Sequence, residues 1–381
     1  MTVFAEDDED EEHVPAAVAA ARDSGMTAVG ISASRLGRLS PAGAEALATL
    51  WSEVGLVESV SEGVSLIGRR AALTFPRGDT RLPDVLVGHG DRLSIDAGTN
   101  RVLDQHRGKV TLDGGGVDRW RRAFDIRDAY CRVRGIDYGV LIAPDTFSVH
   151  AEDFSAFGDD SDDRPVRKIL ASPPDTARLV YPLAALRRSR ERGIVCDTVD
   201  SHWSGFGAYI AYGELQEAMP RHLGRIPEAE VDVVHRLGTG DLGDKFATAL
   251  IGEHTECFVR SPRSRRVWTN GVKNRGNMGL WVSNRQDLPR GVLFVDSYGW
   301  KLQRFLAESF SSMFVIHSPH FEWEVVEKYR PDVVVSLMAE RFLIRPPDDH
   351  PAESAVVTAA RKELGSRLPS LVEVITGSVE G

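Results

Sequence analysis

Near its C-terminal end the sequence alternates apolar runs with helical patterns, and this alternation narrows the choice of folds more than length or composition does. Three short apolar runs are expected as buried strands, over residues 291–295, 313–316 and 332–337. Helical patterns over residues 298–310 and 322–329 separate them. Strands that alternate with helices in this way form βαβ units around a mostly parallel sheet. We therefore expect an α/β protein whose mostly parallel sheet is flanked by helices.

The same alternation extends toward the N-terminus. A buried strand is expected over residues 138–143, and shorter strands over 179–181 and 194–196. A basic amphipathic helix is expected over 183–192, and a second helix over 205–219. Apolar runs of strand length and longer periodic segments together indicate one extended α/β domain.

Length and charge divide the chain into parts. With 381 residues, 42% of them hydrophobic and 27% charged, it has the composition of a globular protein with a large core. Seven of the acids behind the net charge of −10 lie in one run, residues 6–12, so the rest is nearly neutral and excludes no class of partner. We expect an acidic disordered tail over 1–13, an N-terminal annex of unknown role over 14–80, and a catalytic domain over 81–381. Residues 76–83 read as a linker.

The cysteines and the first residues favour a reducing compartment. Cys131, Cys196 and Cys257 lie far apart without a CxxC pair, so neither a disulfide framework nor a cysteine zinc site is indicated. The first residues lack the basic and apolar regions of an export signal. No apolar run approaches the ~18 residues of a membrane span. We expect a cytoplasmic protein whose partners include neither a membrane nor DNA.

Ser297 directly follows the expected strand 291–295 and precedes a helix. In an α/β fold this position lies at the carboxyl edge of the sheet, where ligands bind. The N–H groups that open the helix are suited to stabilise a developing oxyanion. The alternative is that Asp296 or Ser297 only caps the helix, since Asp and Ser are preferred caps.

Asp200 and His202 lie two residues apart before the expected helix 205–219. In an extended or turning backbone this spacing places both side chains on one side. The carboxylate can then hold one imidazole nitrogen and leave the other facing outward, as a general base for a serine requires. The alternative is a polar helix entry, with Asp200 or Ser204 as the cap and His202 exposed.

Taken together, these two blocks resemble a known family. Asp200-Ser-His-Trp203, followed by Gly205 and Gly207, and then Asp296-Ser297-Tyr298 about a hundred residues later, resemble the SGNH-hydrolase-like domain of the alginate O-acetyltransferase family. Further matches follow in the family's order: Ala143-Pro-Asp145, Gly240-Asp-Leu242, Pro331-Asp-Val-Val-Val335 and Glu340-Arg-Phe-Leu343. The resemblance as a whole covers roughly residues 84–345. The resemblance implies an SGNH-hydrolase-like fold, in which Ser297 is the nucleophile, His202 the base and Asp200 its orienting acid.

The sequence also departs from that family. Val295 stands where Gly is usual, Thr146 where Lys is frequent, and residues 88–92 lack an expected aromatic. The family acts on polysaccharides outside the cytoplasm, whereas this chain shows no export signal. We therefore expect a small-molecule acceptor within a biosynthetic pathway rather than an exported polymer.

Basic residues gather before the serine block. Arg265 and Arg266 are predicted to bind the phosphates of an acyl donor, which would be coenzyme A, a carrier-protein arm or an aminoacyl-tRNA end. Such a donor would be a co-substrate, and no tightly bound cofactor is expected. The alternative for these arginines is a solvated loop.

Three further residues are predicted to contact the substrate. Asn277 lies in an Asn-rich stretch that could supply a side-chain donor to the oxyanion. Trp203 and Tyr298 flank the predicted triad and would suit a flat, amphipathic acceptor. The alternative for both aromatics is packing in the core.

Two other patterns were weighed against different chemistries. Residues 238–243 fit GxGxxG, but no clear acidic partner for a dinucleotide ribose follows, so a dinucleotide site is not expected. His317, His320, Glu322 and Glu324 include metal-binding residue types, but no third ligand has convincing spacing. We expect no metal.

The sequence as a whole predicts a serine-dependent acyltransferase, which moves an acyl group through a Ser297 ester to a hydroxyl or amine. Two alternatives stay open. An esterase would use the same three residues with water as the acceptor. A non-catalytic binding protein would retain the fold without the reaction.

Overall fold

The computed structural model describes residues 2–6, 28–32, 80–82, 84–89, 92–96, 100–158, 160–219, 223–245, 250–351 and 354–364. The acidic run after residue 6 and most of the predicted annex lie outside these residues, so the predicted domain boundaries stay predictions. Strand β1 (Thr2–Glu6) pairs in parallel with β2 (Ala28–Ser32). Within the predicted linker, Thr80–Leu82 forms strand β3.

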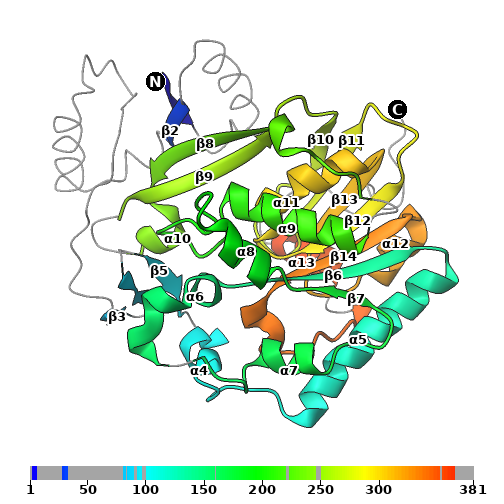
Figure 1. Ribbon diagram of the computed structural model, residues 1–381. Coiled ribbons are helices and arrows are strands. Elements are labelled where there is room, and N and C mark those ends of the chain that lie inside the picture. The colour runs from blue at the N-terminus through cyan, green and yellow to red at the C-terminus, as the bar shows by residue number, and fades with distance from the viewer. Residues whose placement is uncertain are drawn as a thin grey trace.

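The centre of the fold is a seven-stranded sheet with strand order β10-β11-β13-β12-β14-β6-β7 (Figure 1). Its strands are β6 (Asp137–Ala143), β7 (Arg178–Val180), β10 (Ser264–Thr269), β11 (Met278–Ser283), β12 (Arg290–Val295), β13 (Ser312–His317) and β14 (Val333–Ala339). The five strands from β13 to β7 are parallel, while β10 and β11 add an antiparallel edge. The predicted mostly parallel α/β sheet is confirmed.

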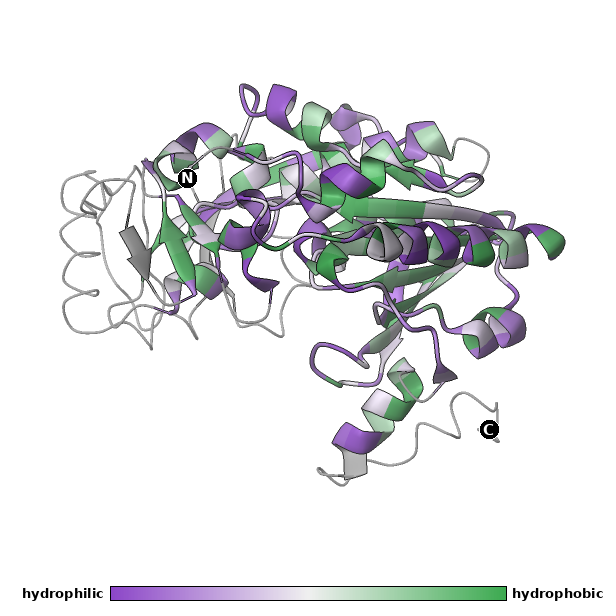
Figure 2. Ribbon diagram, turned by 90° about the horizontal axis from the view of Figure 1, so that it is seen from below, coloured by the Kyte–Doolittle hydropathy of each residue, from purple (hydrophilic) through white to green (hydrophobic). Residues whose placement is uncertain are grey.

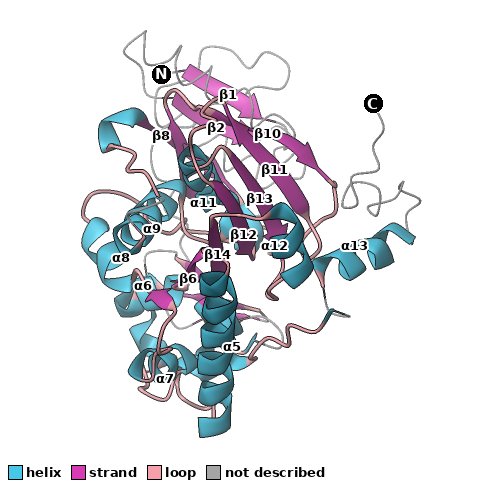
Figure 3. Cartoon of the chain, turned by 90° about the vertical axis from the view of Figure 1, so that its right-hand side faces the viewer, coloured by secondary structure: helices cyan, strands magenta, loops and turns pink. Residues whose placement is uncertain are grey.

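Helices cover both faces of this sheet (Figure 3). On one face lie α8 (Leu183–Ser189), α9 (Gly205–Ala218) and α11 (Gly299–Leu306). On the other lie α5 (Gly114–Val133), α7 (Pro165–Ala171), α12 (Trp323–Tyr329) and α13 (Ala355–Leu364). Because both faces are covered, the parallel strands are nearly continuous apolar runs. Figure 2 shows the same distribution, with strands coloured largely as hydrophobic and helices carrying both colours.

Smaller elements surround the central layers. β3, β4 (Val85–Val87) and β5 (Leu93–Ile95) form an antiparallel sheet, and β8 (Val231–Gly238) pairs with β9 (Gly252–Val259) in an antiparallel hairpin. The short helices are α4 (Val102–His106), α6 (Thr146–Val149) and α10 (Gly240–Gly243), and the 3₁₀ turns are η3 (Ala151–Phe157), η4 (Glu228–Glu230), η5 (Ala307–Ser309) and η6 (Glu340–Ile344). None of the helices in the described ranges combines the length and apolarity needed to cross a membrane.

One predicted strand is absent. Residues 194–196 are not a strand, and Cys196 makes only an isolated bridge with Trp203. The backbone folds back on itself there, because the Val195 carbonyl accepts from the N–H of Ser204 at the start of α9. The segment is therefore a tight loop that carries Asp200 and His202 toward the edge of the sheet.

The order of strands makes the carboxyl end of β12 a position at which open α/β folds bind ligands. After β12 the chain enters α11 on one face, whereas after the neighbouring β13 it enters α12 on the other. Adjacent parallel strands whose helices leave to opposite faces open a ligand crevice at their carboxyl ends. Ser297 follows β12 at this point.

Candidate active site

The turn that presents Ser297 is held by its neighbour, Asp296. One oxygen of Asp296 accepts from the backbone N–H of Tyr298 at 2.9 Å, and the other accepts from the N–H of Ala339 at the end of β14 at 2.6 Å. Asp296 therefore holds the turn before α11, which leaves the Ser297 hydroxyl available. The turn is so tight that a Cβ on Gly299 would lie 2.5 Å from Val295, so the glycine expected before Asp296 is replaced by one after it.

Ser297, His202 and Asp200 form a continuous hydrogen-bonded chain. His202 Nε2 lies 2.7 Å from Ser297 Oγ, and His202 Nδ1 lies 2.7 Å from Asp200 Oδ1. The same carboxylate oxygen accepts from the His202 backbone N–H at 2.9 Å, which fixes the two-residue spacing. Ser204 caps α9 by accepting from the N–H of Gly207, so neither Asp200 nor His202 is needed as the cap.

The electrostatics of this chain suit a general base. Burial alone would lower the pKa of His202, but the adjacent Asp200 carboxylate outweighs burial and raises it. Burial alone would raise the pKa of Asp200, yet the facing imidazole holds it well below its usual range. Asp200 thus stays ionised, fixes the tautomer of His202 and stabilises its protonated form.

The Ser297 backbone N–H is free to face a developing oxyanion. Among the described residues it has no hydrogen-bond partner, whereas the next two N–H groups are taken by Asp296 and the one after by the Ser297 carbonyl. A free N–H beside the nucleophile is the type of donor that stabilises a tetrahedral intermediate.

Trp203 and Tyr298 join the loop of Asp200 and His202 to the turn of Ser297. Trp203 Nε1 donates to the Tyr298 carbonyl at 3.0 Å, and the Tyr298 hydroxyl donates to the Ser201 carbonyl at 2.7 Å. Both side chains are almost completely buried, at 0% and 1% exposure, and their rings meet edge to face. Their prediction as a substrate platform is not supported, because their polar atoms and their surfaces are used inside the protein.

Two residues outside the predicted site support this arrangement. Arg341, directly after β14, donates to the Tyr298 hydroxyl at 3.2 Å and forms a buried ion pair with Asp145 at the end of β6. Burial raises the pKa of Asp145 to about 6, although the positive charge of Arg341 acts to lower it. Both residues fall within stretches that carry the sequence resemblance, but sequence alone gives no sign that they meet beneath the serine turn.

No protein-family model matches the sequence, and no curated protein matches it significantly. The structure of Bacillus cereus PatB1 superposes with a TM-score of 0.51 at 11% identity, over 61% of this chain and 92% of that one. The chain has an SGNH-hydrolase-like fold.

Two further solved structures are similar to this one. The O-acetyltransferase domain of Pseudomonas putida AlgJ gives a TM-score of 0.44 at 17% identity, over 74% of this chain and 100% of that one. Pseudomonas aeruginosa AlgX gives 0.39 at 12% identity, over 68% and 62%.

Within the SGNH-hydrolase-like fold, Arg265 and Arg266 lie far from Ser297. Both are exposed on the edge strand β10, and the register places Arg266 level with Trp281, Met313 and then Gly291 near the start of β12. Ser297 follows the other end of β12, about 20 Å along the strand direction and three strands across. The geometry therefore does not support their prediction as donor-binding residues.

Asn277, in contrast, lies at the same edge of the sheet as Ser297. Its carbonyl accepts from the N–H of His317, whose position in β13 is level with Val295. Its side-chain amide donates to the Val272 carbonyl at 2.6 Å, so this group serves the local loop. Asn277 therefore lies near the carboxyl end of β12, but the hydrogen bond of its side-chain amide supports a structural role and not the predicted contact with the oxyanion.

The glycine-rich segment 238–243 does not form a phosphate cradle. The N–H groups of Leu242 and Gly243 both donate to the Val199 carbonyl. A Cβ on Gly240, which has φ +57°, would lie 2.5 Å from that same carbonyl oxygen. These glycines allow the segment to pack directly against the loop that carries Asp200.

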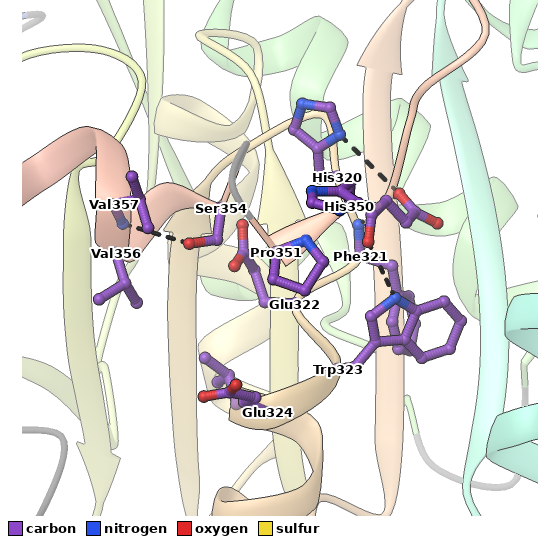
Figure 4. Close-up of a pocket in the computed structure, with 12 residues that line it drawn as sticks. His320, Phe321, Glu322, Trp323, Glu324, His350, Pro351, Ser354, Val356 and Val357 are labelled. Carbon is purple, nitrogen blue, oxygen red and sulfur yellow. Dashed lines mark hydrogen bonds and ion pairs between the residues drawn. The ribbon is translucent and has the colours of Figure 1, made fainter.

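The histidines and glutamates after β13 are engaged in other contacts. Glu322 accepts from Ser318 at 2.8 Å and from the N–H of Ala355 at 2.7 Å, while His320 Nε2 accepts from Arg275 at 2.8 Å. His320, Glu322 and Glu324 line a cavity of about 230 Å³ with the aromatic ring of Trp323 (Figure 4). Glu324 lies apart from His320 in that view, so these side chains do not converge on a common point.

All three cysteines are buried, unpaired thiols. Burial raises the pKa of Cys131, Cys196 and Cys257 to about 12 in each case. Because thiolates rather than thiols are nucleophilic, none of them competes with Ser297 at neutral pH.

Proposed function

We propose that this chain is a serine-dependent acyltransferase. The observation that carries the proposal is the hydrogen-bonded chain from Ser297 Oγ through His202 to Asp200, at 2.7 Å for each step. This hydrogen-bonded chain lies at the carboxyl edge of the central sheet of an SGNH-hydrolase-like fold, beside a free N–H that suits an oxyanion. It contains the nucleophile, the base and the orienting acid of acyl transfer.

In the first half of the reaction, Ser297 Oγ bonds to the carbonyl carbon of an activated acyl donor while His202 Nε2 takes its proton. The Ser297 N–H stabilises the tetrahedral oxyanion. When the bond to the leaving group breaks, that group takes the proton from His202, and the acyl group remains as a serine ester.

In the second half, the hydroxyl or amine of an acceptor attacks the ester carbonyl and gives its proton to His202. The bond to Ser297 Oγ breaks, and His202 returns the proton to Ser297. We propose a small-molecule acceptor and a donor such as an acyl-coenzyme A, an acylated carrier protein or an aminoacyl-tRNA. Transfer rather than hydrolysis is supported by the resemblance of the Asp200–Trp203 and Asp296–Tyr298 blocks to the alginate O-acetyltransferase family.

The first experiment measures the intact mass of the protein after brief exposure to p-nitrophenyl acetate. We expect one acetyl group on the wild type, none on Ser297→Ala, and slow labelling of His202→Ala. Ser155→Ala, which removes an exposed serine in η3, is the matched control and should label like the wild type. A folded wild-type protein that takes up no acetyl group would contradict the proposal.

The second experiment separates transfer from hydrolysis. The acetylated protein is isolated and incubated with a panel of small alcohols and amines, and the products are identified by mass spectrometry. Faster loss of the acetyl group with formation of an acetylated acceptor supports the transferase. Release of acetate at one rate under all conditions identifies an esterase with the same three residues.

A further inference from the structure

The segment 238–243 encloses the loop that carries the general base. Its backbone is fastened to the Val199 carbonyl by two N–H groups, and Gly240 adopts a left-handed conformation that brings it against the same carbonyl. The residue that this arrangement places beside the triad is Asp241. The glycines of the motif thus serve to position one carboxylate.

Asp241 binds both sides of the segment between Asp200 and His202. Its Oδ1 accepts from the backbone N–H of Ser201 at 2.6 Å, and its Oδ2 accepts from the Ser201 hydroxyl at 2.6 Å. Its own N–H donates to Asp200 Oδ2 at 3.3 Å. Three hydrogen bonds from one residue therefore hold the backbone and the acid of the catalytic loop.

The same carboxylate lies close to the imidazole. Asp241 Oδ2 is 4.0 Å from His202 Nδ1, and the Ser201 hydroxyl that it binds is 3.4 Å from that nitrogen. Opposite charges at this separation attract each other, and the attraction is stronger near a protein surface than in bulk water. The Nδ1 edge of His202 thus faces two carboxylates, one in direct contact and one behind it.

Other charged groups around His202 act in the opposite sense. Arg341, from the segment after β14, disfavours the protonated imidazole, and so does His317 at the end of β13 when it is charged. Asp200 and Asp241 favour the protonated form. The ligand-type atoms of Asp200, His202 and Asp241 lie within 4.8 Å of one another, and hydrogen bonds inside the cluster account for this closeness.

We propose that Asp241 is a positioning residue for His202, which it serves by holding residues 200–202 in place and by adding a second negative charge beside the imidazolium formed during acyl transfer. The inference rests on the proposed function. It gives the Gly-Asp-Leu element a task in the reaction, carried out through Asp200 and His202 rather than by contact with the substrate.

The test compares variants that separate charge from hydrogen bonding. Asp241→Asn keeps the size of the side chain and a carbonyl oxygen for Ser201 but removes the charge. Ser201→Ala removes one hydrogen bond and leaves the charge. Asp244→Asn, at an exposed position just after α10, is the matched control. The rate of Ser297 acetylation by p-nitrophenyl acetate is measured between pH 5 and pH 9 for each protein, a range chosen around the ~6.5 of an ordinary histidine.

In each pH–rate profile we expect an acidic limb, where the rate falls as His202 becomes protonated. At pH values above this limb, acetylation of Asp241→Asn should be slower than that of the wild type by about tenfold. The acidic limb of its profile should move to lower pH, because the pKa of His202 falls when a nearby negative charge is lost. Ser201→Ala should lower the rate by less and leave the limb in place. Asp244→Asn should match the wild type in both respects.

The pKa of His202 can also be measured in a protein without the serine hydroxyl, so this measurement does not depend on the proposed function. In the Ser297→Ala background, NMR titration of His202 should give a lower pKa when Asp241→Asn is added. An unchanged pKa and an unchanged limb would overturn the inference, even if the wild type is acetylated normally. Absence of acetylation in the wild type together with a shifted His202 pKa would overturn the proposed function alone.

Discussion

At the scale of single residues, the site is built by dividing two tasks between neighbours. Asp296 caps the turn and Ser297 presents its hydroxyl, while Ser204 caps α9 and His202 presents its imidazole. In each pair one residue satisfies the backbone of a helix start and the other is released for chemistry. The cap and catalytic interpretations of both sequence blocks are therefore compatible rather than exclusive.

The acid of the triad is tested by its pH profile. Asp200→Asn removes the charge that raises the pKa of His202, so the acidic limb of Ser297 acetylation should move to lower pH. Activity requires the neutral imidazole and is lost as pH falls through its pKa. The rate above the limb should fall on the order of a thousandfold, because the tautomer is no longer fixed. Stopped-flow acetylation checks both effects.

Asp162→Asn is the control for this experiment, because the Asp162 side chain is 94% exposed and lies on the loop before α7. Its rate and its limb should equal those of the wild type. An acidic limb that stays in place in Asp200→Asn would contradict the assignment of His202 as the base.

The sequence predicts the arrangement of Asp200, His202 and Ser297 because the pattern that places each of them is local. The two-residue spacing of Asp200 and His202, and the strand end before Ser297, are visible in the sequence, and the structure brings these three side chains together. The prediction that Trp203 and Tyr298 contact the substrate is not supported. Whether an aromatic side chain beside a site contacts a substrate or the core depends on its partners, and here these partners lie about a hundred residues away in sequence. Arg341 and Asp241 were missed for the same reason.

At the scale of elements, a buried ion network fixes the catalytic loop to its surroundings. Asp197, three residues before Asp200 and 0% exposed, forms a salt bridge with Lys301 of α11 and accepts from the N–H of Thr255 in β9. His254 Nδ1 lies 3.3 Å from the same carboxylate. A loop, a helix and a hairpin are thus joined at one side chain.

This junction leads to a prediction about stability. Burial alone would raise the pKa of Asp197, but Lys301 and His254 lower it to about 2. The carboxylate therefore contributes stability above the unfolded pKa of ~3.9, and this contribution is lost as pH falls toward 2. At pH 7, Asp197→Asn should reduce the free energy of unfolding by about 3 kcal/mol, because Lys301 loses a buried partner.

Urea denaturation at several pH values measures this effect. The difference between wild type and Asp197→Asn should be full at neutral pH and shrink below pH ~4 as the wild-type carboxylate is protonated. Lys301→Met combined with Asp197→Asn should recover part of the loss, since no uncompensated charge then remains. A difference that stays constant down to pH ~2 would show that the charge of Asp197 does not stabilise the fold.

At the scale of the whole molecule, the direction of the strands decides which residues reach the site. The βαβαβ order was visible in the sequence and is confirmed over β12, α11, β13, α12 and β14. The antiparallel turn from β10 to β11 was not, and it places Arg265 and Arg266 at the opposite end of the sheet from Ser297. Closeness in sequence to the serine strand therefore did not mean closeness in space.

The corresponding prediction is a negative one. Arg265→Ala combined with Arg266→Ala should leave the KM for a phosphate-bearing acyl donor within about twofold of the wild type, because exposed substitutions far from a site perturb it little. Steady-state kinetics with acetyl-coenzyme A measures this. A large increase in KM would show that these arginines take part in binding the donor.

The burial of all three thiols has a practical consequence for work with this protein. Electrophiles will not reach the three thiols in the folded protein, so a fluorophosphonate probe can be used to titrate the proposed nucleophile, Ser297, without blocking cysteines beforehand. The ratio of bound probe to total protein then reports the fraction of correctly assembled molecules in a preparation. Any thiol labelling that appears reports opening of the core, since Cys196 and Cys257 lie in one buried cluster and Cys131 lies in another.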